Sequence, residues 1–66
     1  MAAKLELIEE PGYYVTLLYE DGPLPIMKTF FLYLSQEKRQ EARQKSEDFA
    51  KTMSKSLKIP LEILVK

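Results

Sequence analysis

The chain contains no cysteine and no histidine among its 66 residues. Without cysteine, neither a disulfide framework nor a thiolate metal site can support the fold. Without histidine, imidazole ligation and histidine-based acid–base catalysis are excluded. A chain of this size buries only about 60% of its unfolded surface on folding. We therefore predict that association with another chain supplies part of its stability.

Long apolar runs are also missing. The longest one, residues 30–34, has the length of a strand and falls far short of the roughly 18 residues of a membrane span. The first residues become acidic at Glu6, with no basic region leading into an apolar one, so we expect no secretory signal. These features predict a cytoplasmic protein without a membrane-embedded part.

Neither sign of charge is in excess over the whole chain, because ten Lys and Arg balance ten Asp and Glu. The two halves differ, however. Residues 1–34 carry two lysines and five acidic side chains, and the second half carries the opposite excess. The basic residues of the second half could be a solvated helix surface or a contact for phosphates. The candidate nucleic-acid contacts are Lys38, Arg39, Arg43 and Lys45.

Four segments have the composition of strands. Residues 5–8, 13–19, 26–34 and 61–65 are rich in β-branched, aromatic and other apolar side chains. Pro11 and Gly12 predict a turn between the first two, and residues 20–25 predict a stiff hairpin tip between the second and third. Because these connections are short, the second and third strands should pair antiparallel.

Residues 35–57 have the periodicity of an amphipathic helix. Ser35 is the predicted N-cap, and Pro60 predicts an end near Lys58. The less polar positions recur every three or four residues. They are Ala42, Ser46, Phe49, Ala50, Met53 and Leu57.

The order β-β-β-α-β predicts one small α+β domain over residues 1–66. It should consist of a three- or four-stranded, mainly antiparallel sheet with the amphipathic helix packed on one face. The order of the strands in the sheet stays open.

One helix covers only one face of a sheet, yet the predicted strands carry apolar or aromatic residues on both faces. We predict that the purely apolar set faces the helix. It comprises Val15, Leu17, Phe30, Leu32, Leu34, Leu61, Ile63 and Val65. The opposite set mixes rings and hydroxyls, as contact surfaces do. It comprises Tyr14, Thr16, Leu18, Met27, Thr29, Phe31, Tyr33 and Leu64. A shift of one residue would exchange the two sets.

No catalytic or cofactor motif is recognisable. No serine has a base beside it, the carboxylates are scattered, and two isolated glycines do not form a phosphate-binding loop. We therefore expect no enzyme activity, no cofactor and no metal site.

The predicted function is a non-enzymatic protein–protein interaction module, such as a small adaptor, inhibitor, or assembly or regulatory factor. It would dock through the aromatic sheet face or the hairpin tip, onto a protein partner or onto itself as a homodimer. The predicted partner-binding residues are Tyr14, Leu18, Leu24, Met27, Phe31 and Tyr33. Two alternatives remain: a nucleic-acid-binding domain that uses the sheet aromatics and the basic helix, and a structural subunit of a larger complex.

Overall fold

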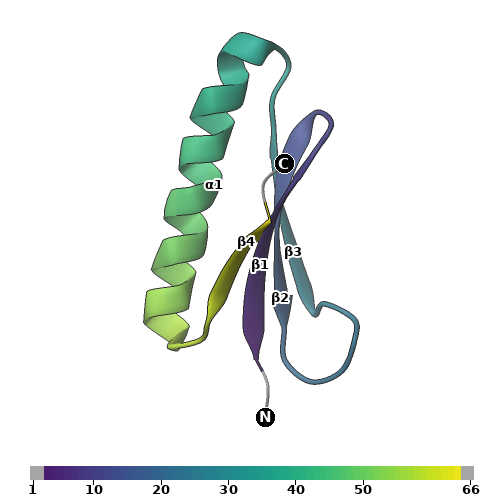
Figure 1. Ribbon diagram of the computed structural model, residues 1–66, viewed down its shortest axis with the longest axis vertical. Coiled ribbons are helices and arrows are strands. Elements are labelled where there is room, and N and C mark those ends of the chain that lie inside the picture. Colours follow the sequence, from purple (N-terminus) through teal and green to yellow (C-terminus); the bar gives the residue numbers. More distant parts are fainter. Residues whose placement is uncertain (1–2, 65–66) are drawn as a thin grey trace.

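The computed structural model describes residues 3–64, which form a four-stranded sheet with one helix lying along one of its faces (Figure 1). The elements are β1 (Lys4–Glu10), β2 (Tyr13–Tyr19), β3 (Met27–Leu32), α1 (Gln36–Leu57) and β4 (Leu61–Leu64). The predicted α+β class and the order β-β-β-α-β are confirmed. Val65, the predicted end of the last strand, lies outside the described residues.

The strands lie in the order β3-β2-β1-β4. The first three form an antiparallel meander, and β4 pairs in parallel with β1, so the sheet is mixed. The parallel pair arises because α1 carries the chain from the β3 edge to the opposite edge. Between β1 and β2 the turn is tight: Glu10 pairs with Tyr13, and Gly12 has φ +90°, as the third position of a type II turn requires.

The helix begins and ends near the predicted residues. Ser35 has the extended backbone of an N-cap, although its side chain makes no capping hydrogen bond. At the other end Lys58 adopts the left-handed conformation, with φ 56° and ψ 47°, and its N–H bonds to the carbonyl of Ser54. The Ser54 hydroxyl in turn donates to the carbonyl of Ile59 at 2.6 Å. This end is therefore satisfied by local bonds before Pro60 starts the final strand.

The core lies between α1 and the sheet. Leu5, Leu7 and Tyr14 are fully buried there, and the helix contributes small side chains to the contact. The buried helix residues are Ala42, Ser46 and Ala50. Their small size lets the ring of Phe31 approach the helix, where it packs against Phe49 with centroids 5.6 Å apart. Within residues 3–64, no helix has both the length and the apolar character that crossing a membrane requires.

The predicted faces of β2 and β3 are wrong. Tyr14 and Thr16, expected on the uncovered face, are 0% and 1% exposed beneath the helix. Phe30 and Leu32, expected in the core, are exposed on the other side of the sheet. Leu34 lies beyond β3 and is 97% exposed.

For β4 the predicted faces are correct. Leu61 and Ile63 pair with the buried Leu5 and Leu7 and therefore lie on the helix-covered face of the sheet. Leu64 lies on the opposite face. The error in β2 and β3 has a physical cause. The buried side chains of the helix are small, so large rings fit beneath it. The size and shape of these rings therefore mattered more for the choice of the covered face than the apolar character of the other set of side chains.

Candidate interaction surface

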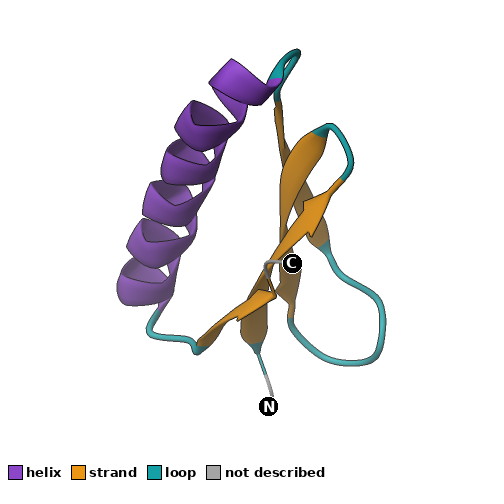
Figure 2. Ribbon diagram, turned by 45° about the horizontal axis from the view of Figure 1, so that its top comes forward, coloured by secondary structure: helices purple, strands orange, loops and turns teal. Residues whose placement is uncertain are grey.

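One face of the sheet has no covering layer within the part of the chain that the structure describes. The helix lies on one side, and the loop between β2 and β3 bends toward the other (Figures 1 and 2). We call the uncovered side the open face. Its residues are Lys4, Glu6, Ile8, Glu10, Tyr13, Val15, Leu17, Tyr19, Lys28, Phe30, Leu32, Glu62 and Leu64.

Strand pairing arranges these side chains in rows across the sheet. The central row is entirely apolar and runs from β3 to β4 through Phe30, Val15, Ile8 and Leu64. The next row toward the loop contains Lys28, Leu17, Glu6 and Glu62 in the same strand order. On the other side of the central row lie Leu32, Tyr13 and Glu10.

The apolar part of the open face is sheltered at its centre and exposed at the β3 edge. Val15 is only 6% exposed because its neighbours surround it, whereas Phe30 is 52% and Leu32 is 72% exposed. Tyr13 packs edge-on against Phe30 with ring centroids 5.6 Å apart. Tyr13, Val15 and Phe30 border a shallow hollow of about 370 Å³, to which Pro25 of the β2–β3 loop also contributes. The centre of the open face is therefore apolar and slightly concave.

Charge on the open face is unevenly distributed. The β1–β4 side carries Glu6, Glu10 and Glu62, and the β3 side carries Lys28. Glu6 is partly neutralised by Lys4, with 3.4 Å between Nζ and Oε2. Burial raises the pKa of Tyr19, and the nearby Glu6 carboxylate raises it further. One half of the face is thus acidic and the other half is aromatic with one cation.

A polar cluster lies beneath the helix on the opposite side of the sheet. Arg39 donates to Glu9 with 2.6 Å between Nη2 and Oε2. This hydrogen bond lowers the pKa of Glu9 below its usual value, although burial opposes the shift. Burial raises the pKa of Tyr14, and the nearby Glu9 carboxylate adds to the effect.

The approach of Tyr14 to Glu9 falls short of a complete hydrogen bond. Within residues 3–64 the Tyr14 hydroxyl, Oε1 of Glu9 and Oγ1 of Thr16 are buried without a hydrogen-bond partner. Because Tyr14 is fully buried, a substrate has no access to its hydroxyl. The cluster therefore joins α1 to β1 through the Arg39–Glu9 contact.

The predicted nucleic-acid contacts are all engaged with carboxylates. Lys38 and Lys45 both pair with Glu41, at 3.9 and 3.2 Å. Arg43 pairs with Glu47 at 3.1 Å, and Arg39 with Glu9 as described above. Lys45 lowers the pKa of Glu41, which keeps this carboxylate charged. Three carboxylates therefore offset part of the positive charge of these four residues, which weakens the attraction to a phosphate backbone.

The predicted partner-binding residues lie mostly on the wrong face for docking. Tyr14, Leu18, Phe31 and Tyr33 are on the helix-covered side, with Tyr14 and Tyr33 in ring contact at 5.8 Å. Met27 also belongs to that side but is 37% exposed at the sheet edge. Leu24, on the loop, is 75% exposed.

Sequence reasoning missed the exposed residues of the open face, above all Tyr13, Phe30 and Leu32. A usable signal was present in β1, where Lys4, Leu5, Glu6 and Leu7 alternate polar and apolar. The tight Pro11-Gly12 turn transfers this alternation to β2, because it fixes the pairing of Glu10 with Tyr13.

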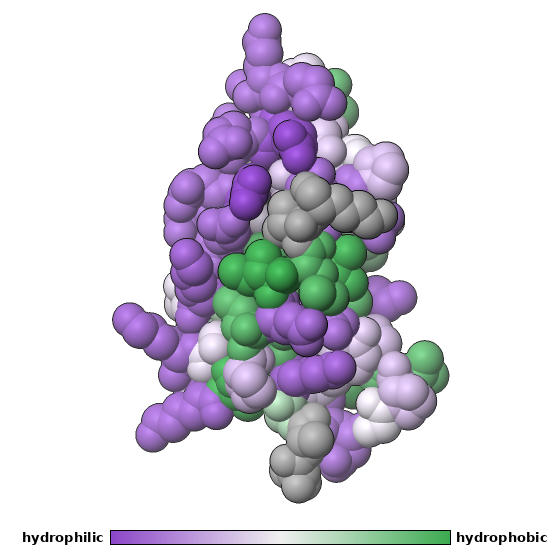
Figure 3. Space-filling model, in the orientation of Figure 1, coloured by the Kyte–Doolittle hydropathy of each residue, from purple (hydrophilic) through white to green (hydrophobic). Residues whose placement is uncertain are grey.

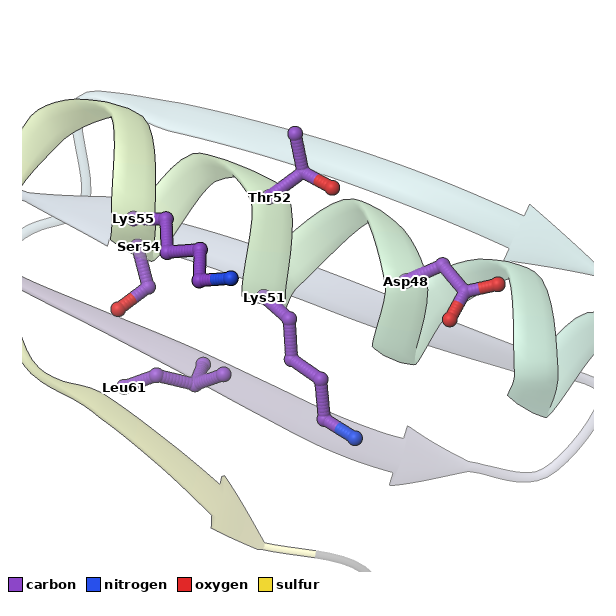
Figure 4. Close-up of a pocket in the computed structure, with 6 residues that line it drawn as sticks. All are labelled: Asp48, Lys51, Thr52, Ser54, Lys55 and Leu61. Carbon is purple, nitrogen blue, oxygen red and sulfur yellow. The ribbon is translucent and has the colours of Figure 1, made fainter.

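A second concave area lies between α1 and β4. It measures about 440 Å³ and is lined by Asp48, Lys51, Thr52, Ser54, Lys55 and Leu61 (Figure 4). Its lysines and Asp48 are exposed, and the Ser54 hydroxyl is already bonded to Ile59. The described residues contain no group of acidic side chains able to hold a metal ion.

The β4 edge adds apolar surface. Figure 3 shows a hydrophobic area near the middle of this side, beside the hydrophilic outer surface of the helix. Ile63 and Leu64 of β4 are 43% and 41% exposed. Apolar surface thus continues from the open face to the edge strand.

No model of a known protein family matches the chain, and no curated protein or solved structure shows significant similarity to it.

Proposed function

We propose that this chain is a non-enzymatic protein–protein interaction module that docks through the open face of its sheet. The observation that carries the proposal is the ordered apolar row of Phe30, Val15, Ile8 and Leu64, which lies on the side away from the helix. An adaptor, an inhibitor, or an assembly or regulatory factor needs such a surface and no catalytic group.

The composition of the open face supports this role. Tyr13 and Phe30 offer ring edges and faces in a fixed geometry, so little side-chain entropy is lost on binding. Glu10 and Lys28 lie at its border, as the polar rim of an interface does. The exposed Leu24 on the loop extends the same side of the molecule.

The ion pairs of α1 argue against nucleic acid as the partner, because four basic residues of the helix already face carboxylates. A cytoplasmic location fits the absence of cysteine, since disulfides are the usual support of small secreted domains. We include this location in the proposal.

The test is a binding comparison between Phe30→Glu and Lys51→Glu. Both substitutions introduce the same side chain at an exposed position, one on the open face and one on α1. The proteins are tagged, checked by circular dichroism and used to capture partners, including untagged copies of the chain. We expect Phe30→Glu to lose whatever the wild type binds and Lys51→Glu to retain it. Equal binding by both variants would refute the open face as the docking surface.

A further inference from the structure

We infer that the open face binds a second copy of this chain, in a dimer whose two-fold axis runs parallel to the strands and passes between β1 and β2. This inference rests on the proposed function and adds the identity of the partner. It follows from three features: the small core of one copy, the charge pattern of the open face, and the size of the sheet.

The core of one copy is small. Among the described residues, only six hydrophobic side chains are buried, and two of them are alanines. One of the six, Val15, belongs to the open face and is sheltered only by its neighbours. A chain of this length without disulfides or metal usually needs association to gain more buried apolar surface. A partner that is always present at equal concentration meets this need, and a second copy is such a partner.

The charge pattern makes the face complementary to itself. Rotation about an axis parallel to the strands places the β3 side of one copy over the β4 side of the other, at the same height along the strands. Lys28 and Glu62 lie in one row, at the two ends of it. In the dimer Lys28 therefore faces Glu62 of the partner copy, and the contact occurs twice.

The central row matches under the same rotation. Phe30 lies over Leu64 of the partner copy, and Val15 lies over Ile8 of the partner copy, close to the axis. All of these contacts are apolar, as the middle of an interface requires. Leu17 lies over the aliphatic part of Glu6, whose carboxylate is already paired with Lys4.

The other simple two-fold arrangement is unfavourable. An axis across the strands would place each strand over its own copy, so the acidic side would face the acidic side. Glu6, Glu10 and Glu62 of both copies would then gather in one region. Like charges brought together in an interface cost several kcal/mol, so the charge pattern selects the axis parallel to the strands.

The size of the sheet allows a small interface. Its strands of seven, seven, six and four residues, at about 4.8 Å spacing and about 3.3 Å per residue, give a flat area of about 380 Å² per copy. A specific interface covers about 600–1,000 Å² of accessible surface per partner. The flat area alone is below this range, and the relief of the side chains and the β2–β3 loop, in which Leu24 is 75% exposed, adds to it. The proposed dimer therefore has a small interface, whose affinity depends on the apolar row and the paired charges.

A charge exchange tests the geometry. Lys28→Glu and Glu62→Lys each convert two attractive contacts of the dimer into repulsive ones. We expect each variant alone to dissociate at least about tenfold more readily than the wild type. In an equimolar mixture the carboxylate introduced at position 28 faces the ammonium group introduced at position 62, so a heterodimer should form and restore the affinity. Light scattering over a dilution series measures the affinity, native mass spectrometry identifies the heterodimer, and Lys51→Glu is the matched control.

Zero-length cross-linking provides a second readout that needs no substitution. Lys28 and Glu62 lie on the two edge strands, three strand spacings or about 14 Å apart. A carbodiimide cannot join them within one chain, but it can join them across the proposed dimer. We expect a Lys28–Glu62 peptide whose two halves come from different copies in a mixture of labelled and unlabelled protein.

The outcomes separate this inference from the proposed function. A wild type that stays monomeric at every concentration refutes the second copy, and the Phe30→Glu binding comparison then decides about the open face independently. A dimer that both charge variants retain, without the Lys28–Glu62 peptide, refutes this arrangement. If that dimer also survives Phe30→Glu, the open face itself is refuted. Single variants that dissociate and recombine on mixing support the inference.

Discussion

Tyr13 and Tyr14 are adjacent tyrosines on opposite faces of β2, and truncating each should have very different effects. Tyr14 is fully buried under α1, whereas Tyr13 lies on the open face in contact with Phe30. Replacing a fully buried aromatic side chain by alanine costs about 3–5 kcal/mol. The loss of one edge-on ring contact costs about 0.5–1.5 kcal/mol. We expect Tyr14→Ala to be by far the more destabilising substitution.

The total stability determines what will be observed. A chain of 66 residues at about 0.05–0.15 kcal/mol per residue has a free energy of unfolding of roughly 3–10 kcal/mol. Tyr14→Ala removes about a third of this or more, so its urea midpoint should fall by several molar at a slope near 1 kcal/mol per molar. At the lower end of the range the variant will be unfolded without urea.

The assay is urea unfolding followed by circular dichroism, because α1 dominates the signal. Association would add its own stability, so the two substitutions are compared in a Lys28→Glu background, in which the proposed dimer is weakened. Tyr14→Phe serves as a control that keeps the ring and removes the unpartnered hydroxyl. Its free energy of unfolding should stay within about 1 kcal/mol of the parent value.

The reverse order would refute the assignment of the two faces. If Tyr13→Ala unfolds the domain and Tyr14→Ala does not, the helix covers the face that we describe as open. Equal effects would mean that both faces are buried in the monomer.

Three further substitutions test other parts of the structure. The hydrogen bond from Arg39 lowers the pKa of Glu9 below its usual value. The charged Glu9 therefore stabilises the fold at neutral pH, and this stabilisation is lost as the pH falls through the lowered pKa. Glu9→Gln should therefore flatten the acid limb of stability measured between pH 7 and 3, and an unchanged limb would contradict the role of the pair. Lys58 has φ 56°, and Lys58→Gly should relieve about 1 kcal/mol of strain and raise the melting temperature by about 4–8 °C; a lower melting temperature would argue against the left-handed cap. Phe49→Ala should lower the free energy of unfolding by about 3 kcal/mol, because Phe49 packs on Phe31. A stability equal to that of the wild type would disprove this contact between helix and sheet.

The secondary structure was predictable because its signals are local. Ser35 and Pro60 bracket the helix in the sequence, and the observed bounds of Gln36–Leu57 follow. Pro11 and Gly12 marked the first turn, and residues 13–19 form β2 as expected. The last strand begins directly after Pro60, as predicted.

The covered face was not predictable from β2 and β3 alone, because both of their faces carry large apolar or aromatic side chains. The decisive information lies in β1, where Leu5 and Leu7 alternate with Lys4 and Glu6. Continuing that alternation along β1 would also have put Glu9 in the core, which is unfavourable unless a cation such as Arg39 reaches it. The partner arrives from the helix, 30 residues further along the chain.

The position of β4 had no local signal. Whether the last strand lies beside β1 or beside β3 depends on the direction in which α1 crosses the sheet, which is a property of the whole fold. The nucleic-acid alternative also depended on such contacts, because its candidate residues prove to be paired with carboxylates from both the helix and β1.

The parallel pairing of β1 with β4 has a consequence for the order in which the domain assembles. Leu5 pairs with Leu61, about 56 positions away in the sequence, whereas the three antiparallel strands are joined by short turns. Closing so long a loop costs about 3.5 kcal/mol by the logarithmic rule for chain entropy, before any contact compensates for it. The meander should therefore form first, and β4 should join last and open first. Amide hydrogen exchange would then be fastest in β4, and each opening would expose the edge of β1, where the charges of Lys4 and Glu6 discourage pairing with a foreign strand.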